Sequence, residues 1–308
     1  MVTPTIPSGT AAPSRGRAWL LASRPATLPA AVGPVLVGLG IAVGHGTLRP
    51  PAAAATLAVA VLLQVAANLA NDLFDFLAGA DTADRLGPPR AAALGLLTAR
   101  ELAAGTALVL ALAAVLGLYL VSVGGPAILV LGALAIASAL AYTGGPLPYG
   151  YLGLGELFVF AFFGLAGVAG TAYLQLGTVE PVALGASVPS GSLVTAILVA
   201  NNLRDIATDR RAGKRTLAVR FGERVTIAEY EALLAVAFVV PAALVVAGAA
   251  TLPALLPLAT VPLVLPLLRT VRAGGDPRRL NGVLRGTARL SLLFAALFAI
   301  GLATGGHA

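Results

Sequence analysis

The sequence predicts an all-α polytopic membrane protein with nine transmembrane helices. Of its 308 residues, 58% are hydrophobic and only 11% are charged, and the mean hydropathy is +0.93. This balance is typical of chains whose solvent is a lipid bilayer. Apolar stretches recur along the chain, and most approach the roughly 17 to 25 residues that a helix needs to cross a membrane. The basic residues fall almost entirely in alternate connections between these stretches.

Nine apolar segments define the expected helices, of which the sixth and the eighth are short. They span residues 26–44, 54–74, 103–121, 127–143, 156–176, 190–204, 228–249, 252–268 and 288–305. Residues 1–17 are rich in Pro, Ser, Thr and Gly and lack the apolar core of a signal peptide. We therefore expect a disordered cytosolic tail there, followed by a single transmembrane domain over residues 18–308.

The basic residues set the expected orientation. They lie in the tail and in the second-to-third, sixth-to-seventh and eighth-to-ninth connections, and only Arg49 lies elsewhere. With a cytosolic N-terminus these connections all face the cytosol, as the positive-inside rule requires, and the C-terminus faces outward. Attraction to anionic lipid explains the net charge of +7, so we expect a multi-pass protein of the cell (plasma) membrane that binds no nucleic acid.

Two of the expected helices carry polar stripes where apolar residues belong. The first stripe consists of Gln64, Asn68, Asn71, Asp72 and Asp75. The second consists of Asn201, Asn202, Asp205, Thr208 and Asp209. The spacing of three and four residues puts each set on one helical face. Because the two helices run in the same direction, the stripes resemble a parallel internal duplication whose members both reach the cytosolic end.

An ionised carboxylate inside a membrane helix costs at least ~2.5 to 3.5 kcal/mol, so these stripes need an explanation. One explanation is that they are solvated helix ends, with the acids capping helices or pairing with nearby Arg. The amides extend the stripes inward, however, which favours cation binding. Carboxylate and amide oxygens suit a hard ion such as Mg²⁺, whose remaining ligands are commonly water and substrate phosphate. The absence of cysteine excludes thiolate metal sites and cysteine nucleophiles.

Basic residues directly after the second stripe could bind a diphosphate. Arg210, Lys214 and Arg215 follow Asp209 within six residues, and Lys214 is the only lysine in the chain. An Arg side chain forks onto phosphate oxygens, whereas Lys supplies a point charge. Arg24, which precedes Pro25 at the mouth of the first helix, is a further candidate. A topology signal alone would also explain these charges.

Four stretches of the chain resemble the UbiA superfamily of intramembrane aromatic prenyltransferases. They are residues 23–30 (SRPATLPA), 68–75 (NLANDLFD) with 79–82, 142–146 (YTGGP) through 155–156, and 201–205 (NNLRD) through 213–217 (GKRTL). Within the superfamily the chain is most similar to the branch that acts on 1,4-dihydroxy-2-naphthoate in menaquinone biosynthesis. The stretches cover most of residues 19–222, and beyond about residue 225 only hydropathy agrees.

Two departures limit what this resemblance carries over. In the hydroxybenzoate enzymes the fourth-helix Tyr is followed four residues later by Lys, whereas Tyr142 is followed by Pro146. The third Asp of the first motif arrives at Asp81 behind Gly79 instead of four residues after Asp75. Asp81 is therefore either a metal ligand or a loop-capping residue.

The resemblance implies Mg²⁺-dependent transfer of a polyprenyl chain from polyprenyl diphosphate to 1,4-dihydroxy-2-naphthoate, with loss of CO₂. It implies catalytic roles for Asn68, Asp72, Asp75, Asp205 and Asp209, with the four Asp as metal ligands. It implies substrate contacts for Arg24, Asn71, Tyr142, Tyr149, Glu156, Asn201, Asn202, Arg210, Lys214 and Arg215. The tyrosines, Tyr151 among them, could stabilise an allylic cation through their ring faces or anchor the chain at the interface. Glu156 could equally cap a helix.

Other functions remain open from the sequence. A UbiA-type enzyme with another acceptor, such as 4-hydroxybenzoate, differs only in the ring that it binds. A cation-coupled secondary transporter would place its carboxylates near the bilayer midplane, whereas these stripes open toward the cytosol. A non-catalytic quinone-binding protein would have no need for Mg²⁺.

Overall fold

The computed structural model describes residues 14–80 and 85–305, and every regular element in those two ranges is helical. Eight segments in that part of the chain are long and apolar enough to cross a membrane. A further apolar helix there, Pro126–Ala141, has only 16 residues. The all-α membrane fold is thus confirmed, whereas the count of nine crossings and their orientation stay predictions.

Most elements follow one another with short connections, whereas residues 78–98 join α3 to α4 and residues 142–154 join α5 to α6. In chain order they are α1 (Arg15–Ser23), η1 (Pro25–Thr27), α2 (Leu28–Gly44), α3 (Pro50–Leu77), α4 (Ala99–Gly124), α5 (Pro126–Ala141), α6 (Gly155–Val159), η2 (Phe160–Ala169), α7 (Gly170–Leu176), α8 (Pro181–Arg211), α9 (Leu217–Val246), η3 (Leu252–Leu263), α10 (Val264–Arg272), η4 (Pro277–Arg279) and α11 (Leu280–Thr304). Helix α1 begins at Arg15, so residues 15–17 are helical although the sequence analysis assigned them to the tail.

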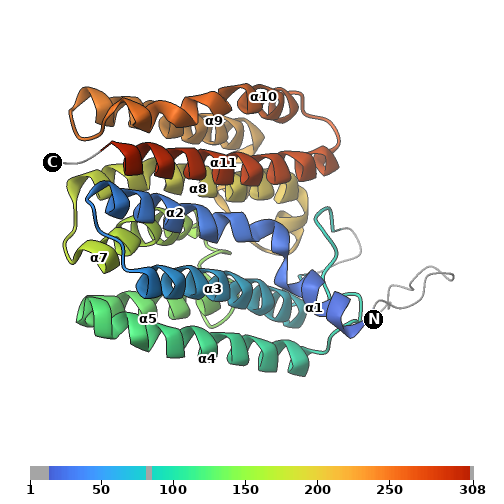
Figure 1. Cartoon of the computed structure of the whole chain (residues 1–308). Coiled ribbons are helices and arrows are strands. Elements are labelled where there is room, and N and C mark those ends of the chain that lie inside the picture. Colours follow the sequence, from blue (N-terminus) through green and yellow to red (C-terminus); the bar gives the residue numbers. More distant parts are fainter. Residues whose placement is uncertain (1–13, 81–84, 306–308) are drawn as a thin grey trace.

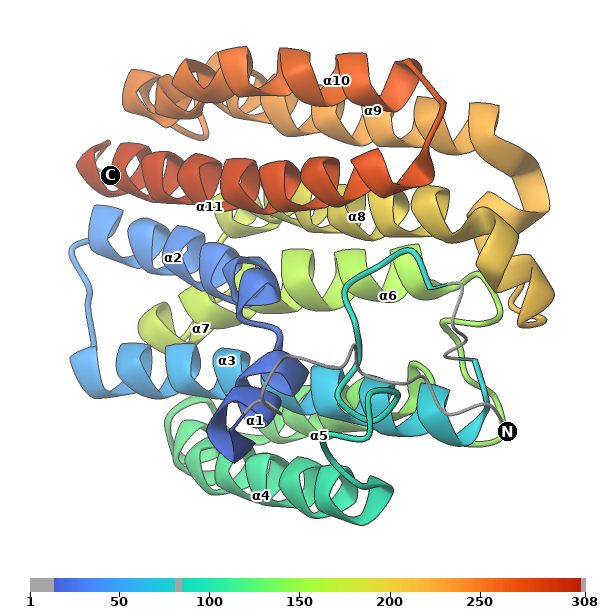
Figure 2. The ribbon, with the colours of Figure 1, turned by 90° about the vertical axis from the view of Figure 1, so that its right-hand side faces the viewer.

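The helices lie side by side in one bundle (Figure 1). Helices α9 and α10 form one edge and α4 and α5 the opposite edge, with α8, α11, α2 and α3 between them, and a view from another side shows the same order (Figure 2). The start of α1 and the end of α11 lie at opposite ends of the bundle (Figure 1). An odd number of crossings would give this arrangement.

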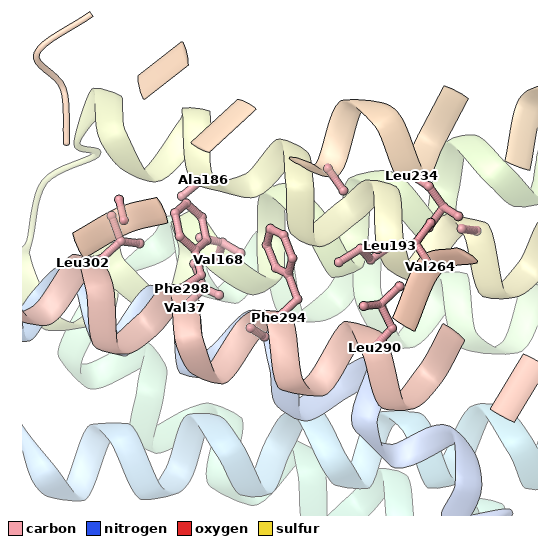
Figure 3. Close-up of a cluster of buried hydrophobic side chains, with 14 of the residues drawn as sticks. Val37, Val168, Ala186, Leu193, Leu234, Val264, Leu290, Phe294, Phe298 and Leu302 are labelled. Atoms are coloured by element: carbon pink, nitrogen blue, oxygen red, sulfur yellow. The ribbon is translucent and has the colours of Figure 1, made fainter. Parts of the chain in front are cut away.

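The largest buried cluster lies where α2, α8 and α11 meet. Phe294 and Phe298 of α11 are fully buried and point into it (Figure 3), with ring centroids 5.7 Å apart. Gly40 lets α2 approach α11 closely, since a Cβ at this position would lie 2.4 Å from the carbonyl oxygen of Ala299. Small residues permit this kind of close helix contact in membrane proteins.

Helix α8 is longer than expected because the serine hydroxyls in its first half are hydrogen-bonded within the helix. It begins at Pro181, whereas hydropathy placed the start at residue 190. The hydroxyls of Ser187 and Ser190 donate to carbonyl oxygens one turn earlier, those of Ala183 and Ala186. Hydropathy counts these serines as polar, but their hydrogen bonds are satisfied inside the helix, as a membrane interior requires.

Two expected helices contain irregular turns. The segment expected over 156–176 contains ten residues of π-helix, η2, between α6 and α7. The segment expected over 252–268 starts as the 3₁₀ helix η3, in which Pro257 and Pro262 remove backbone donors. Extended π-helix is rare and often marks a functional site, and η2 lines the pocket described next.

Candidate active site

Two adjoining pockets open between the helices. A polar pocket of about 260 Å³ lies among the ends of α3 and α8, and an apolar pocket of about 570 Å³ lies among α2, α3, α4, α5, η2 and α7. Both are lined by Gln64, Asn71, Tyr142, Val159 and Phe163. A ligand with a charged head and a long apolar tail could therefore occupy both at once.

The polar pocket gathers most of the two predicted stripes. Asn71 and Asp75 lie one turn apart on α3, and Asn201, Asp205 and Asp209 follow one another at intervals of one turn on α8. The lining is completed by groups that include Arg24, Arg85, Arg90, Tyr142, Thr143, Tyr151, Asn202, Thr208 and Lys214. The structure therefore brings both stripes to one place, together with several cations.

Asp75 is the most heavily bonded acid of the pocket. It is 1% exposed, and its Oδ1 accepts hydrogen bonds from Tyr151 Oη at 2.5 Å and from Lys214 Nζ at 3.5 Å. Its Oδ2 accepts a hydrogen bond from the guanidinium of Arg90. A buried carboxylate without such partners would be strongly unfavourable, so the loop residues Arg90 and Tyr151 are part of what keeps Asp75 at the pocket wall.

A glycine turn at the end of α8 places Lys214 over the acids. Gly213 has a φ of +75°, the left-handed conformation that glycine adopts without strain. Its N–H donates to Arg210 O, and the N–H of Lys214 donates to Asp209 O at 2.9 Å, which is the Schellman pattern of a helix end. The chain thereby turns back, so Lys214 Nζ lies 3.9 Å from Asp209 Oδ1 and 4.5 Å from the ring centre of Tyr151.

Arg24 reaches the pocket from a strained backbone. It is the only residue other than glycine with a positive φ, +48°, in the described ranges. Pro25 disfavours the right-handed helical conformation at the preceding residue, so α1 ends here with the N–H of Arg24 donating to Leu21 O. The side-chain Nη2 is buried and has no hydrogen-bond partner among the described residues. Strain of this kind is often kept where it positions a functional group.

Arg204 organises the α8 side of the pocket. This guanidinium is 2% exposed and donates to Asp205 Oδ1 from Nε at 2.8 Å and to Asn201 Oδ1 from Nη2 at 2.7 Å. Its Nη1 donates to Asn281 Oδ1 of α11, whose amide in turn donates to Leu86 O. Asn281 was not predicted from the sequence, because it lies in the region where only hydropathy agreed with the family. From the sequence alone, Arg204 counts among the basic residues that set the topology, because it lies at the end of an expected helix.

Asp72 lies outside both pockets, contrary to the expectation that it would face the same site as Asp75. Its Oδ2 accepts a hydrogen bond from Ala91 N at 3.0 Å, and its Oδ1 accepts one from Ala92 N at 3.4 Å. The residue is 1% exposed. Neighbouring positions on a helix point about 100° apart, so Asn71 faces the pocket while Asp72 anchors the connection between α3 and α4.

The remaining predicted residues divide into those near the pockets and those away from them. Asn68 lines the apolar pocket, and its Nδ2 donates to Ser23 O at 2.9 Å. Glu156 is buried behind the polar pocket and lines neither one. Arg210 and Arg215 are exposed and line neither pocket, because the turn at the end of α8 directs only Lys214 inward. Asp81 lies outside the described residues.

A row of aromatic rings joins the pockets. Tyr142 meets Tyr149 edge to face at 5.3 Å, Tyr149 stacks on Phe158 at 4.2 Å, and Phe158 faces Phe162 at 6.3 Å. Burial, with the nearby Glu156 carboxylate, raises the pKa of Tyr142 above its usual range. Burial also raises the pKa of Tyr149, although its hydrogen bond to Ser138 acts in the opposite direction.

The lining also contains cations that the sequence analysis assigned only to topology. Arg85 and Arg90 come from the connection between α3 and α4 and line the polar pocket. Their side chains reach it because Asp72 and Asp75 fix that connection against α3. No spacing rule within a helix could have found them, since they belong to a different segment.

The oxygen ligands of the polar pocket fit Mg²⁺ in type. The carboxylates of Asp75, Asp205 and Asp209 line it. No three His, Cys, Asp or Glu side chains in the described ranges are grouped closely enough to hold a metal ion by themselves. Protein-bound Mg²⁺ usually takes one or two carboxylates and completes its shell with water and substrate phosphate, so this donor set suits an ion that arrives with a diphosphate.

Comparison with known proteins points to one family. Residues 31–284 match the model of the UbiA prenyltransferase family. The 1,4-dihydroxy-2-naphthoate octaprenyltransferase of Mycobacterium tuberculosis is 44% identical over 287 residues, covering 93% of this chain and 97% of the relative. The Escherichia coli enzyme of the same name is 39% identical, covering 94% of this chain and 96% of the relative.

A solved structure has the same fold. It is a UbiA homologue from Archaeoglobus fulgidus bound to GPP and Mg²⁺, with a TM-score of 0.64 and 18% identity, and the match covers 92% of this chain and 99% of that one. At this identity the likeness supports the fold.

We predict that Asp72→Ala loosens the connection between α3 and α4. The change leaves the N–H groups of Ala91 and Ala92 without their acceptor, and an unpaired buried donor costs ~1 to 3 kcal/mol. Hydrogen exchange of the protein in lipid nanodiscs, followed by mass spectrometry, should show residues 85–97 exchanging about tenfold faster, with α9 unchanged.

The matched control is Asp276→Ala, which removes an exposed carboxylate that accepts a hydrogen bond from the N–H of Arg278. It should leave the exchange of residues 85–97 unaltered. Unchanged exchange of residues 85–97 in Asp72→Ala would contradict the anchoring role.

Proposed function

The chain belongs to the UbiA prenyltransferase family, and we propose that it transfers a polyprenyl chain from polyprenyl diphosphate to 1,4-dihydroxy-2-naphthoate with loss of CO₂. The observation that carries this proposal is the continuity of a cationic polar pocket with a larger apolar pocket. The names of relatives that share 39 to 44% of their residues with this chain over nearly its whole length support the choice of acceptor. The direct product would be the quinol form of demethylmenaquinone.

The diphosphate head of the donor would lie in the polar pocket. Arg24 presents a guanidinium nitrogen that no described residue uses, and Lys214 stands between Asp75 and Asp209. Both cations can bind phosphate oxygens, Arg as a planar fork and Lys as a point charge. The isoprenoid tail would lie in the apolar pocket, whose wall runs along Tyr149 and Phe158.

Asp75, Asp205 and Asp209 would hold Mg²⁺ together with the diphosphate, and Asp81 is a further candidate. When bound, the ion supplies Lewis-acid stabilisation for the negative charge that develops on the leaving diphosphate. When neither Mg²⁺ nor diphosphate is bound, the basic side chains beside these acids would hold the carboxylates in place. The structure of the Archaeoglobus homologue, which contains GPP and Mg²⁺, supports this use of the ion.

The protein's own groups would direct the transfer. The allylic C–O bond of the donor breaks, and the electron pair leaves with the diphosphate. The aromatic faces of Tyr142 and Tyr149 can stabilise the positive carbon, and the surrounding apolar wall excludes the water that would quench it. The ring carbon that bears the carboxylate then forms the new C–C bond, and that carboxylate leaves as CO₂.

The pocket would open on the cytosolic face of the cell membrane. Arg24, Arg85, Arg90 and Lys214 gather at this end of the bundle, and an excess of basic residues favours the cytosolic side. Soluble substrates made in the cytosol would then reach the polar pocket directly, while the tail of the donor enters from the lipid.

Competition between two acceptors tests the proposal. Membranes containing the protein receive polyprenyl diphosphate and Mg²⁺ together with 1,4-dihydroxy-2-naphthoate and 4-hydroxybenzoate, and prenylated products and released CO₂ are followed. We expect prenylated naphthoquinol and CO₂ in equal amounts, and no product after chelation of Mg²⁺. Product from 4-hydroxybenzoate alone would show that the benzoate, and not the naphthoate, is the acceptor. No product from either acceptor would contradict prenyl transfer, and cation-driven solute uptake would then be measured.

Lys214→Ala should raise the KM for the prenyl diphosphate by about tenfold while changing the KM for the acceptor little, because a charge-assisted hydrogen bond is worth ~1.5 to 3 kcal/mol. Steady-state kinetics in nanodiscs measures both constants. Arg278→Ala, which removes an exposed basic residue outside the pockets, serves as the charge control and should leave both constants unchanged. An unaltered donor KM in Lys214→Ala would remove the lysine from the diphosphate site.

A further inference from the structure

Two asparagine side chains of the polar pocket have their oxygens bound by neighbours. The hydroxyl of Thr143 donates to Asn71 Oδ1 at 2.9 Å, and Arg204 Nη2 donates to Asn201 Oδ1 at 2.7 Å. A guanidinium can only donate, so the amide of Asn201 has one possible orientation. With their oxygens used in these hydrogen bonds, both amides keep their NH₂ groups, which are donors, for a ligand in the pocket.

Asn202 has the opposite orientation. Its Nδ2 donates to Glu156 Oε1 at 2.7 Å, and this bond turns the NH₂ group toward the carboxyl group. The NH₂ group must face Glu156, and the amide oxygen must face away from it. Asn202 is 5% exposed and lines the polar pocket, and its oxygen accepts no hydrogen bond from the described residues. This side chain thus gives the pocket a fixed hydrogen-bond acceptor.

The surroundings of this oxygen suit an aromatic ring. Leu198 lies one turn before Asn202 on α8 and also lines the pocket. A Cβ placed on Gly155, at the start of α6, would lie 3.2 Å from the Leu198 side chain and 3.6 Å from the ring of Tyr142. Leu198 and Tyr142 therefore both lie beside Gly155, the residue before Glu156, and both line the pocket that Asn202 lines.

The two substrates differ in what they could offer to the Asn202 oxygen. A diphosphate at neutral pH carries acceptor oxygens and negative charge, so the amide oxygen would repel it. A phenolic hydroxyl carries a donor. A buried acceptor that awaits a donor discriminates strongly, because a ligand without the hydroxyl leaves it unpaired.

We propose that Asn202 Oδ1 accepts a hydrogen bond from a ring hydroxyl of the aromatic acceptor, and that Glu156 is the positioning residue that holds this amide in orientation. The inference rests on the proposed function and places the binding site of the aromatic acceptor beside Asn202. Drawing the hydroxyl proton toward the amide also increases electron density in the ring, which favours attack on the allylic carbon. Glu156 is 8% exposed and lines neither pocket, so it acts through Asn202.

The test compares inhibitors that differ by one hydroxyl. Inhibition constants for 1-hydroxy-2-naphthoate and 4-hydroxy-2-naphthoate are measured against that for 2-naphthoate in nanodiscs, alongside the KM of each substrate. In the wild type we expect at least one hydroxylated compound to bind about tenfold more tightly. Asn202→Leu should reduce this preference to about twofold or less and raise the acceptor KM by about tenfold, with the donor KM unchanged.

Glu156→Gln keeps the size of the side chain and guards against a folding defect in Asn202→Leu. A glutamine can donate or accept, so it no longer dictates the orientation of Asn202, and part of the hydroxyl preference should be lost. Ser192→Ala is the control, because Ser192 is a buried polar residue of the same helix that lines neither pocket. It should keep the wild-type preference.

Three results would overturn the inference. They are a hydroxyl preference that survives Asn202→Leu, a Glu156→Gln variant that behaves as the wild type, and a loss of donor or Mg²⁺ affinity in place of acceptor affinity. If the wild type instead prenylates only 4-hydroxybenzoate, the proposed acceptor is wrong. The hydroxyl preference is then measured with 4-hydroxybenzoate against benzoate, so the two failures can be told apart.

Discussion

A carboxylate buried within membrane helices must be paired, and the pairing of Asp75 sets the arrangement of the whole site. Three separate segments supply its partners: Arg90 from the α3–α4 connection, Tyr151 from the α5–α6 connection and Lys214 from the turn after α8. Each partner fixes a connection against the end of α3. The same acid that could help to bind Mg²⁺ therefore also assembles the walls of the pocket.

The backbone at two helix ends also places basic side chains beside the acids of the polar pocket. Gly213 turns the chain at the end of α8 so that Lys214 returns over Asp209, and the strained Arg24 ends α1 with its guanidinium at the pocket. Behind these residues the bundle is held by close contacts of small residues and by the cluster around Phe294 and Phe298. A rigid scaffold and irregular helix ends together give a polar head site that continues into an apolar one.

The sequence was sufficient for the helical class and for most of both polar stripes, because spacing along one helix determines which residues share a face. It could not show that Asp72 turns away to the α3–α4 connection, since that depends on where Ala91 and Ala92 lie in space. Asn281 could not be predicted either, because its partner Arg204 is 77 residues away in the sequence and the contact depends on the fold. Arg210 and Arg215 were proposed because they lie close in sequence to a motif; both are exposed and line neither pocket, so their contact with substrate stays a prediction.

The most direct measurement is an experimental structure of the protein in nanodiscs with Mg²⁺ and a polyprenyl thiodiphosphate, in which sulfur replaces the bridging oxygen so that the donor cannot react. The diphosphate should contact Lys214 and Arg24, and the tail should follow the ring of Tyr149 toward Phe158. A diphosphate bound away from Asp75 and Asp209, or a tail lying along α9 and α10, would contradict the single continuous site.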